Sequence, residues 1–317
     1  MTEGAGLDHQ SEGGTGGAFR SGFVCIVGRP NAGKSTLTNA LVGQKVAITS
    51  GRPQTTRHAV RGILHRPDAQ LVLVDTPGLH RPRTLLGERL NDLVRGALAE
   101  VDVVVFCLPA DQRVGPGDRY IAAQLADLGG RPVVAVATKA DLVGRARLAE
   151  HLMEISELGE WAEIVPVSAL DGYQVDTLVE LLVAQLPPGP PLYPAGELTD
   201  EPDVVMVAEL VREAALEGVR DELPHSLAVV VDEIVRREGR QGSDGQPFLD
   251  VRVNLFVERD SQKAIVIGKG GSRLRQVGSA ARPAIEALLG ATVFLDLHVK
   301  VAKDWQRDPK QLHRLGF

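Results

Sequence analysis

Residues 28–35 read GRPNAGKS, and this stretch decides the fold of the first half of the chain. An apolar run at 23–27 leads into it, and apolar residues with helical spacing follow at 35–42. Glycines near both ends let the backbone wrap, so that several N–H groups converge on phosphate oxygens at the start of a helix. Lys34 would bring its charge to the terminal phosphates and Ser35 its hydroxyl to Mg²⁺. The pattern predicts a P-loop, because the strand before it and the helix after it argue against a chance match.

A second motif, VDTPG, ends another apolar run and strengthens this prediction. We expect Asp75 to hold Mg²⁺ through a water and the Gly78 N–H to donate to the γ-phosphate. Because that bond lasts only as long as the γ-phosphate, the loop would act as a switch. Upstream lies the polar stretch QTTR. We favour Thr56 as the hydroxyl that closes over Mg²⁺, with Thr55 as the alternative and an ordinary loop hydroxyl as the competing interpretation.

Residues that select the base should follow two later apolar runs. The motif TKAD begins at Thr138, and SAL begins at Ser168. The Asp141 carboxylate can accept two hydrogen bonds, from N1–H and the exocyclic amine of guanine, whereas adenine would leave it unpaired. Lys139 would lie along the base plane, and the Ala169 N–H would donate to the guanine oxygen. The order of these motifs predicts GTP rather than ATP.

These motifs define one predicted site. Its catalytic residues would be Lys34, Thr56 and Gly78. Its Mg²⁺ ligands would be Ser35, Thr56 and Asp75. The predicted nucleotide-binding residues are Gly28, Asn31, Ala32, Gly33, Lys34, Ser35, Thr36, Asp75, Gly78, Thr138, Lys139, Asp141, Ser168, Ala169 and Leu170.

The chain divides into two predicted domains on either side of a proline-rich stretch. In 21–186, short apolar runs alternate with helical segments, which predicts an α/β domain with a mostly parallel sheet and helices on both faces. Residues 187–203 read as a stiff linker, since five prolines fall between Leu186 and Gly196. In 204–317 the order is helix, strand, strand, glycine-rich turn, helix, helix, strand, which predicts an α+β domain. We expect 1–20 to be a disordered tail and 236–246 to be a polar hairpin turn.

Charge is distributed unevenly along the chain. The net charge is −6, yet residues 251–317 hold twelve lysines and arginines against six acidic residues. A basic end on an acidic body is typical of a local polyanion site, although a chance fluctuation is an alternative. Cys25 and Cys107 lie in apolar runs and are expected to be buried thiols rather than a disulfide or metal site. No apolar run suggests a signal peptide or a membrane span.

The sequence IVIGKGGSR, which starts at Ile265, contains a GxxG turn between two predicted helices. Glycines at this position let a nucleic-acid backbone approach closely, whereas a plain helix–helix turn is the default interpretation. The order of elements and the local charge favour a type II KH domain that binds single-stranded RNA. Trp305 is either a stacking surface or, as we favour, a hydrophobic pin for the last helix. The predicted RNA-binding residues are Ile267, Gly268, Lys269, Gly270, Gly271, Arg273, Arg275, Lys300 and Lys303.

Taken in order, GRPNAGKS, QTTRH, DTPG, TKAD, SAL, the proline-rich linker, ELPHS, GKGG and the closing RLGF resemble the Era family of bacterial GTPases. The resemblance runs from about residue 21 to 317. It implies a P-loop NTPase G domain followed by a KH domain, Mg²⁺ as cofactor, and the 3′ end of 16S ribosomal RNA in the small ribosomal subunit as partner. It also implies K⁺ near Asn31, for which a loop-stabilising amide is the alternative. Further implications are a monomer, a cytoplasmic location and peripheral contact with the inner face of the membrane.

Two residues differ from those usual at their positions, one in the Era family and one in many other GTPases. Thr138 stands where the family has Asn, and its single hydroxyl donor should weaken nucleotide binding by about 1 kcal/mol. Leu79 stands where many GTPases have a Gln that orients the attacking water, so intrinsic hydrolysis should be slow. These departures favour, as an alternative function, an RNA-binding scaffold that hardly turns nucleotide over. A GTPase acting chiefly at membranes or in cell-cycle control is a third hypothesis.

Overall fold

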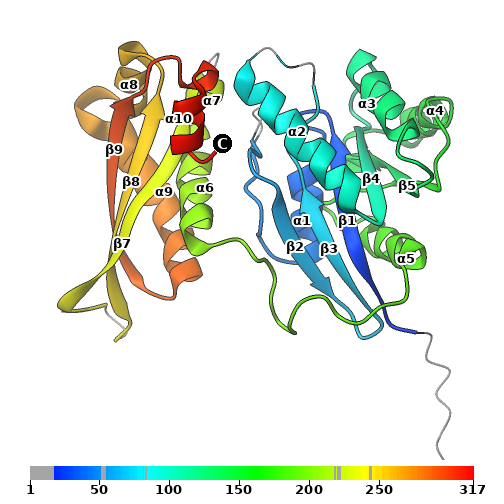
Figure 1. Cartoon of the computed structure of the whole chain (residues 1–317), viewed down its shortest axis with the longest axis horizontal. Helices are drawn as coiled ribbons and strands as arrows, with labels where there is room; N and C mark the ends of the chain where they lie inside the picture. The colour runs from blue at the N-terminus through cyan, green and yellow to red at the C-terminus, as the bar shows by residue number, and fades with distance from the viewer. Residues whose placement is uncertain are drawn as a thin grey trace, which may run out of the picture.

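The computed structural model describes residues 18–50, 55–80, 82, 84–217, 219, 223–242 and 245–317. Within them the chain forms two sheets, each with its own helices, joined by a long segment that passes beneath the first sheet (Figure 1). The tail expected at 1–20 lies almost entirely outside the described residues.

The first sheet has six strands in the order β2-β3-β1-β4-β5-β6. All neighbours are parallel except the β2–β3 pair, which is antiparallel. Its strands are β1 (Arg20–Gly28), β2 (Val60–His65), β3 (Ala69–Asp75), β4 (Val103–Pro109), β5 (Val133–Thr138) and β6 (Glu163–Pro166). Its helices are α1 (Lys34–Val42), α2 (Leu85–Glu100), α3 (Pro116–Ala126), η1 (Ala140–Leu142), α4 (Arg145–Ser156) and α5 (Val175–Gln185).

Two cores sandwich this sheet, which explains its continuous apolar strands. Leu37 of α1 and Leu182 of α5 pack with Ile26 and Val105 on one face. Residues of α2, α3 and α4 pack with Phe106 and its neighbours on the other. A parallel sheet covered on both faces buries every strand residue, so β3 and β4 carry no polar alternation. The predicted α/β architecture is confirmed, and Cys25 and Cys107 are buried free thiols.

Two elements lack a clear signal in the sequence. β2 lies at the sheet edge, where Arg61 is exposed and His65 half-buried, so it shows no continuous apolar run. α4 buries only His151 and Ile155. A helix with so narrow a buried stripe gives a weak periodic pattern.

The proline-rich segment follows the edge of the six-stranded sheet. The Ser21 N–H donates to Pro187 O at 3.3 Å, and the Ile63 N–H donates to Leu198 O at 2.8 Å. Gln70 Oε1 accepts from the main-chain N–H groups of Leu192 and Tyr193. Prolines lack N–H donors of their own, so the segment is held largely through its carbonyls and the N–H groups of its non-proline residues.

The second sheet has three strands in the order β7-β8-β9, with β7–β8 antiparallel and β8–β9 parallel. Its elements are α6 (Asp203–Leu216), α7 (Leu223–Ser226), β7 (Ala228–Gln241), β8 (Pro247–Val257), α8 (Asp260–Ile267), η2 (Lys269–Gly271), α9 (Ser272–Leu289), β9 (Thr292–Val301), η3 (Trp305–Arg307) and α10 (Pro309–Arg314). The predicted succession of strands and long helices is confirmed, but the glycine-rich turn lies between α8 and α9 rather than before both helices, and α7 was not predicted. The predicted hairpin turn at 236–246 is wrong at its start, because β7 continues to Gln241, which pairs with Pro247.

A separate apolar cluster joins the two halves. Trp305 has no exposed side-chain surface, and it packs with Leu86 and Leu90 of α2 and with Leu312 of α10. Its indole N–H donates to Ser226 O at 3.0 Å. The expectation of a hydrophobic pin is therefore confirmed, since a ring so placed has no free face for stacking on a base.

We expect Trp305→Ala to lower the free energy of unfolding by about 3–5 kcal/mol, because it empties a fully enclosed site and removes a buried hydrogen bond. Urea unfolding followed by circular dichroism measures the change. Phe294→Ala is the control: Phe294 is 49% exposed and its ring centre lies 5.2 Å from the Arg237 guanidinium carbon, so its loss should cost about 1 kcal/mol, well below the loss for Trp305→Ala. Similar small losses for both variants would contradict the role given to Trp305.

Candidate active site

The P-loop connects the end of β1 to the first turn of α1. Asn31 and Gly33 adopt left-handed backbone conformations, with φ of 62° and 88°. A Cβ on Gly28 would lie 2.7 Å from Cys107 O, so no larger residue fits where the loop leaves the sheet. The loop thus turns tightly over the helix N-terminus, as a phosphate-binding turn requires.

Lys34 lies beneath this loop rather than in solvent. Its side chain is buried, and Nζ donates to Gly28 O at 3.3 Å and to Arg29 O at 3.1 Å. Burial lowers the pKa of Lys34, although the nearby Asp75 carboxylate opposes that shift. A buried cation held by two loop carbonyls stands ready to meet an anion that binds in the loop.

Three oxygen-bearing side chains from separate segments meet beside the loop. Ser35 Oγ donates to Asp75 Oδ2 at 2.6 Å and lies 2.9 Å from Thr56 Oγ1. Thr56 Oγ1 donates to Asp75 Oδ2 at 3.2 Å. Asp75 is fully buried, its Oδ1 has no hydrogen-bond partner among the described residues, and burial raises its pKa. An all-oxygen set around a buried carboxylate fits Mg²⁺, the cation predicted for these three residues.

Gly78, the residue predicted to bind the γ-phosphate, lies against the P-loop. A Cβ there would approach Pro30 N to 2.6 Å, so the backbone contact requires glycine. The next N–H, that of Leu79, donates to Gly28 O at 3.2 Å. The Leu79 side chain is only 1% exposed and packs into the core beneath α2, so it takes no part in holding a water.

The base-binding motifs follow β5 and β6 and lie side by side. The Ala140 N–H donates to Val167 O at 3.2 Å, which joins the two loops. Thr138 Oγ1 donates to Ala32 O at 2.6 Å, so this hydroxyl ties the TKAD motif to the P-loop. Asp141 is exposed and free to meet a base, and Leu170 is 78% exposed at the tip of the SAL loop.

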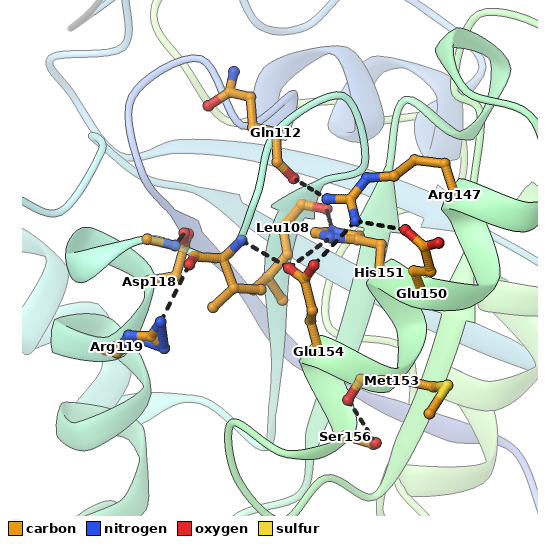
Figure 2. A network of polar contacts seen from close by, with 12 residues as sticks. Leu108, Gln112, Asp118, Arg119, Arg147, Glu150, His151, Met153, Glu154 and Ser156 are labelled. Atoms are coloured by element: carbon orange, nitrogen blue, oxygen red, sulfur yellow. Dashed lines mark hydrogen bonds and ion pairs between the residues drawn. The ribbon is translucent and has the colours of Figure 1, made fainter.

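Helix α4 braces the loop after β4, which supports one wall of the base site. Lys139 Nζ pairs with Asp111 of that loop at 3.3 Å. Arg147 donates to Gln112 O and pairs with Glu154 (Figure 2). Glu154 also accepts a hydrogen bond from the Val114 N–H at 3.1 Å. His151, buried in the same network, lies 3.4 Å from Leu108 O, and burial lowers its pKa.

The cavity over the P-loop is small, about 50 Å³, and Thr49, Thr55 and Thr56 are among the residues that line it. Larger cavities of about 1050 Å³ and 840 Å³ lie between α3 and α4 and between α2 and the β2–β3 pair. Neither contains a predicted site residue. The chemistry of the lining residues, not the cavity volume, therefore makes this cavity the candidate active site.

The GxxG turn has the backbone that glycine alone adopts easily. Gly268, Gly270 and Gly271 have φ of 72°, 58° and 76°, and Lys269 is exposed between them. Arg275 Nη2 donates to Gly270 O at 3.1 Å and so lies against the turn. The turn thus brings exposed main-chain groups and positively charged side chains together, as a contact to a nucleic-acid backbone requires.

The other predicted RNA-binding residues are more dispersed. Ile267 packs partly into the core of the second half, whereas Ile265 is 54% exposed. Lys300 alternates with Val299 and Val301, which face the helices, so it projects from the opposite face of the sheet from the turn. Lys303 is exposed beyond the end of β9. Arg273 turns away from the GxxG turn, and Nη2 donates to Ala215 O and Glu217 O.

Comparison with known proteins agrees with this geometry. Residues 23–139 match the model of a family described as 50S ribosome-binding GTPase, and residues 222–306 match the KH domain model. The GTPase Era of Streptomyces coelicolor is 68% identical over 303 residues, 94% of this chain and 95% of that protein. The GTPase Era of Mycolicibacterium smegmatis is 66% identical over 301 residues, 94% of this chain and 99% of that protein. The chain belongs to the Era family of GTPases.

Two solved Era structures, each 38% identical to this chain, extend the comparison. One is Era in complex with MgGDPNP and nucleotides 1506–1542 of 16S ribosomal RNA, with a TM-score of 0.88. The other is a tyrosine-to-alanine variant of Aquifex aeolicus Era bound to GDP·AlF4⁻, with a TM-score of 0.87. Both comparisons cover 94% of this chain and 99% of the other. This Era-family protein is thus a GTPase with a G domain and a KH domain.

Sequence reasoning missed several residues that shape the site. Arg29 of the P-loop pairs with the buried Asp118 of α3 at 2.6 Å, which fixes the outer side of the loop. Arg57 and Arg212 are both buried beside the Thr56 loop. A charged residue that is buried by a distant element carries no local sequence signal. Arg29 and Arg57 lay within recognised motifs, whereas Arg212 lay outside all of them.

We expect Thr138→Asn to tighten GDP binding about fivefold, because the amide adds a donor that the hydroxyl lacks, and one net hydrogen bond contributes about 1 kcal/mol. Thr138→Val should weaken binding about fivefold or more, since it leaves the buried Ala32 carbonyl without its donor. Isothermal titration calorimetry measures both. Equal affinities in the wild type and both variants would show that Thr138 has no part in nucleotide binding.

Proposed function

We propose that this GTPase uses GTP binding and hydrolysis to control its hold on the 3′ end of 16S ribosomal RNA during maturation of the small ribosomal subunit. One observation carries the proposal: the loop with Thr56 meets the predicted metal ligands and is also bound by the half of the chain that contains the GxxG turn. A change at the terminal phosphate therefore has a physical route to the KH domain. The relative solved with both MgGDPNP and 16S RNA supports this pairing of ligands.

The proposal assigns the phosphate chemistry to the P-loop and the two switch loops. Lys34 and the N–H groups at the start of α1 bind the phosphates, and Ser35, Thr56 and Asp75 bind Mg²⁺. A bound Mg²⁺ neutralises phosphate charge during phosphoryl transfer. The Gly78 N–H binds the γ-phosphate from the loop that touches Pro30, so its position depends on the nucleotide state.

Hydrolysis in this site proceeds without a side chain that orients the attacking water from position 79, because Leu79 is buried in the core. The proposal assigns water positioning to main-chain groups of the switch loops, which makes unassisted hydrolysis slow. It also includes K⁺ beside Asn31, an exposed residue in a left-handed turn of the P-loop. A cation there would add positive charge near the phosphates.

The remaining parts of the proposal concern the place of action. A factor that binds 16S RNA works in the cytoplasm, and we propose that it does so as a monomer. None of the described helices combines the length and apolar character needed to cross a membrane. Peripheral contact with the inner face of the membrane needs no such helix and stays a prediction.

Asp141→Asn should change the base preference from guanine to xanthine, because its amide donates where the carboxylate accepted. GTP affinity should fall at least about a hundredfold, the scale of leaving polar groups of the base unpaired in the complex. Competition between GTP and XTP for a fluorescent nucleotide measures the switch. If the variant still prefers GTP over XTP, Asp141 does not bind the base.

The RNA affinity of the full chain should depend on the nucleotide. We expect the Kd for a 16S 3′-end RNA to differ by about tenfold or more between the GTP-analogue and GDP forms, as coupling free energies of 1–3 kcal/mol imply. Fluorescence anisotropy measures it, and phosphate release in K⁺ and in Na⁺ tests the cation in the same samples. Identical RNA affinity with GTP analogue, GDP and no nucleotide would sink the proposal.

A charge reversal at the GxxG turn distinguishes a direct RNA contact from the effect of net protein charge on RNA affinity. Lys269→Glu should weaken RNA binding in every nucleotide state, whereas Lys310→Glu, equally exposed but on α10, should weaken it far less.

A further inference from the structure

The loop that carries Thr56 is bound by the second half of the chain on both sides of that residue. The carbonyl of Thr55 accepts a hydrogen bond from Arg212 Nη2 of α6. Arg57, with none of its side chain exposed, donates to Leu227 O at 2.7 Å. The threonine predicted to bind Mg²⁺ is therefore flanked by a main-chain carbonyl and an arginine side chain, both bound by the second half of the chain.

Arg212 is held rigidly for this contact. Its Nε donates to Glu209 Oε1 at 2.9 Å, and its Nη2 to Glu209 Oε2 at 2.5 Å, one turn back along α6. Only 2% of the Arg212 residue surface is exposed. A planar guanidinium fixed at two atoms by a carboxylate has little freedom, so it presents its remaining Nη2 hydrogen in one direction, toward the Thr55 carbonyl.

The next residue of α6 binds the other end of the same loop. Glu213 Oε1 accepts from the Thr49 N–H at 2.9 Å, and its other oxygen pairs with Lys45. Adjacent side chains of one helix thus hold the loop before residue 51 and after residue 54.

Aromatic contacts complete the enclosure around Arg57. The guanidinium carbon lies 5.6 Å from the ring centre of Trp305 and 5.8 Å from that of Phe317. The ring of His58 stacks on Phe317 with centroids 5.3 Å apart and planes within 11°. Since Arg57 and His58 follow Thr56 directly, rotation of the Thr56 backbone would break these contacts as well.

The C-terminal end of α6 is also bound by α9, the helix that follows the GxxG turn. Arg273, in the first turn of α9 just after that turn, donates to the carbonyls of Ala215 and Glu217, at 3.2 Å and 2.7 Å. Ala215 lies about one turn beyond Arg212 on α6. Contacts between described residues therefore run without a break from the glycine turn to the Thr55 carbonyl.

We propose that Arg212, set by Glu209, is a positioning residue for GTP hydrolysis that holds the Thr56 hydroxyl at the metal site from the KH side of the molecule. The inference rests on the proposed function, because it takes Thr56 as a ligand of Mg²⁺ in the GTP state. Arg212 touches no nucleotide and acts only through the main chain of Thr55. Loss of Arg212 should therefore weaken binding of the triphosphate, which needs Thr56 at the metal, and leave binding of the diphosphate unchanged.

Arg212→Ala in the full chain, without RNA, should raise the Mg²⁺ concentration for half-maximal hydrolysis about tenfold, the scale of a hydrogen bond to a charged donor. Affinity for a GTP analogue should fall by a similar factor, with GDP affinity unchanged. Arg212→Lys, which keeps the charge but loses the two-point hold on Glu209, should recover part of the loss. Stopped-flow fluorescence and calorimetry provide these values.

A second variant guards against misfolding. The double variant Arg212→Met, Glu209→Met replaces the buried ion pair with apolar side chains of similar length, a change that is often neutral or stabilising. We expect an unfolding midpoint near that of the wild type, together with the Mg²⁺ and GTP-analogue defects of Arg212→Ala. A folded double variant with wild-type Mg²⁺ dependence and a wild-type ratio of GTP-analogue to GDP affinity would overturn the inference.

Matched controls distinguish the positioning role of Arg212 from the assignment of Thr56 as a Mg²⁺ ligand. Arg131 also donates to main-chain carbonyls, those of Leu98 and Ala99, at the far side of the G domain, so Arg131→Met should leave the affinity ratio unchanged. Thr56→Ala should show the full Mg²⁺ defect. If Thr56→Ala shows none, the metal-site assignment fails. If Thr56→Ala shows the defect and both Arg212 variants do not, the positioning role alone fails.

Discussion

The meeting of Ser35, Thr56 and Asp75 is the contact on which the rest of the structure depends. A carboxylate without solvent contact is costly unless a cation or hydrogen-bond donors compensate it, and here two hydroxyls donate to one of its oxygens. Ser35 belongs to α1 and Asp75 ends β3, so the sheet fixes both. Thr56 has no such support, because it lies in a loop between α1 and β2. Whatever holds that loop decides whether the oxygen cluster forms.

The second half of the molecule supplies that support largely through main-chain contacts. Arg212 and Arg57 form hydrogen bonds with carbonyls, and Glu213 accepts from an N–H. Bonds to the backbone fix where the chain runs, whereas pairs between long exposed side chains leave it free to move. The second half of the molecule thus borders the loop that carries Thr56 and also contains the GxxG turn. A linker that only tethered two independent domains would not give this arrangement.

Much of this could be predicted from local patterns. Buried strands covered on both faces are apolar throughout, so β3 and β4 were recognisable, as were the P-loop and the motifs at 75–78, 138–141 and 168–170. β2 and α4 were not, because an edge strand and a helix with few buried residues lack periodicity. The hairpin at 236–246 was misjudged, since polar residues on an exposed strand resemble a turn. Arg273 was assigned to RNA from its neighbours alone, yet it contacts the end of α6.

The sequence by itself determined which residues can bind phosphate, Mg²⁺ and guanine, because those demands fall on residue types at fixed spacing beside a strand end or a helix start. It also determined the order of the buried strands and of most of the helices, although β2 and α4 escaped it. Tertiary structure alone decided which distant groups hold the switch loop, where Arg57 and Arg212 are buried, and that Trp305 closes the seam between the halves. The physical reason is that long-range partners are chosen by packing, and an arginine that reaches a carbonyl 157 positions away leaves no trace in its own neighbourhood.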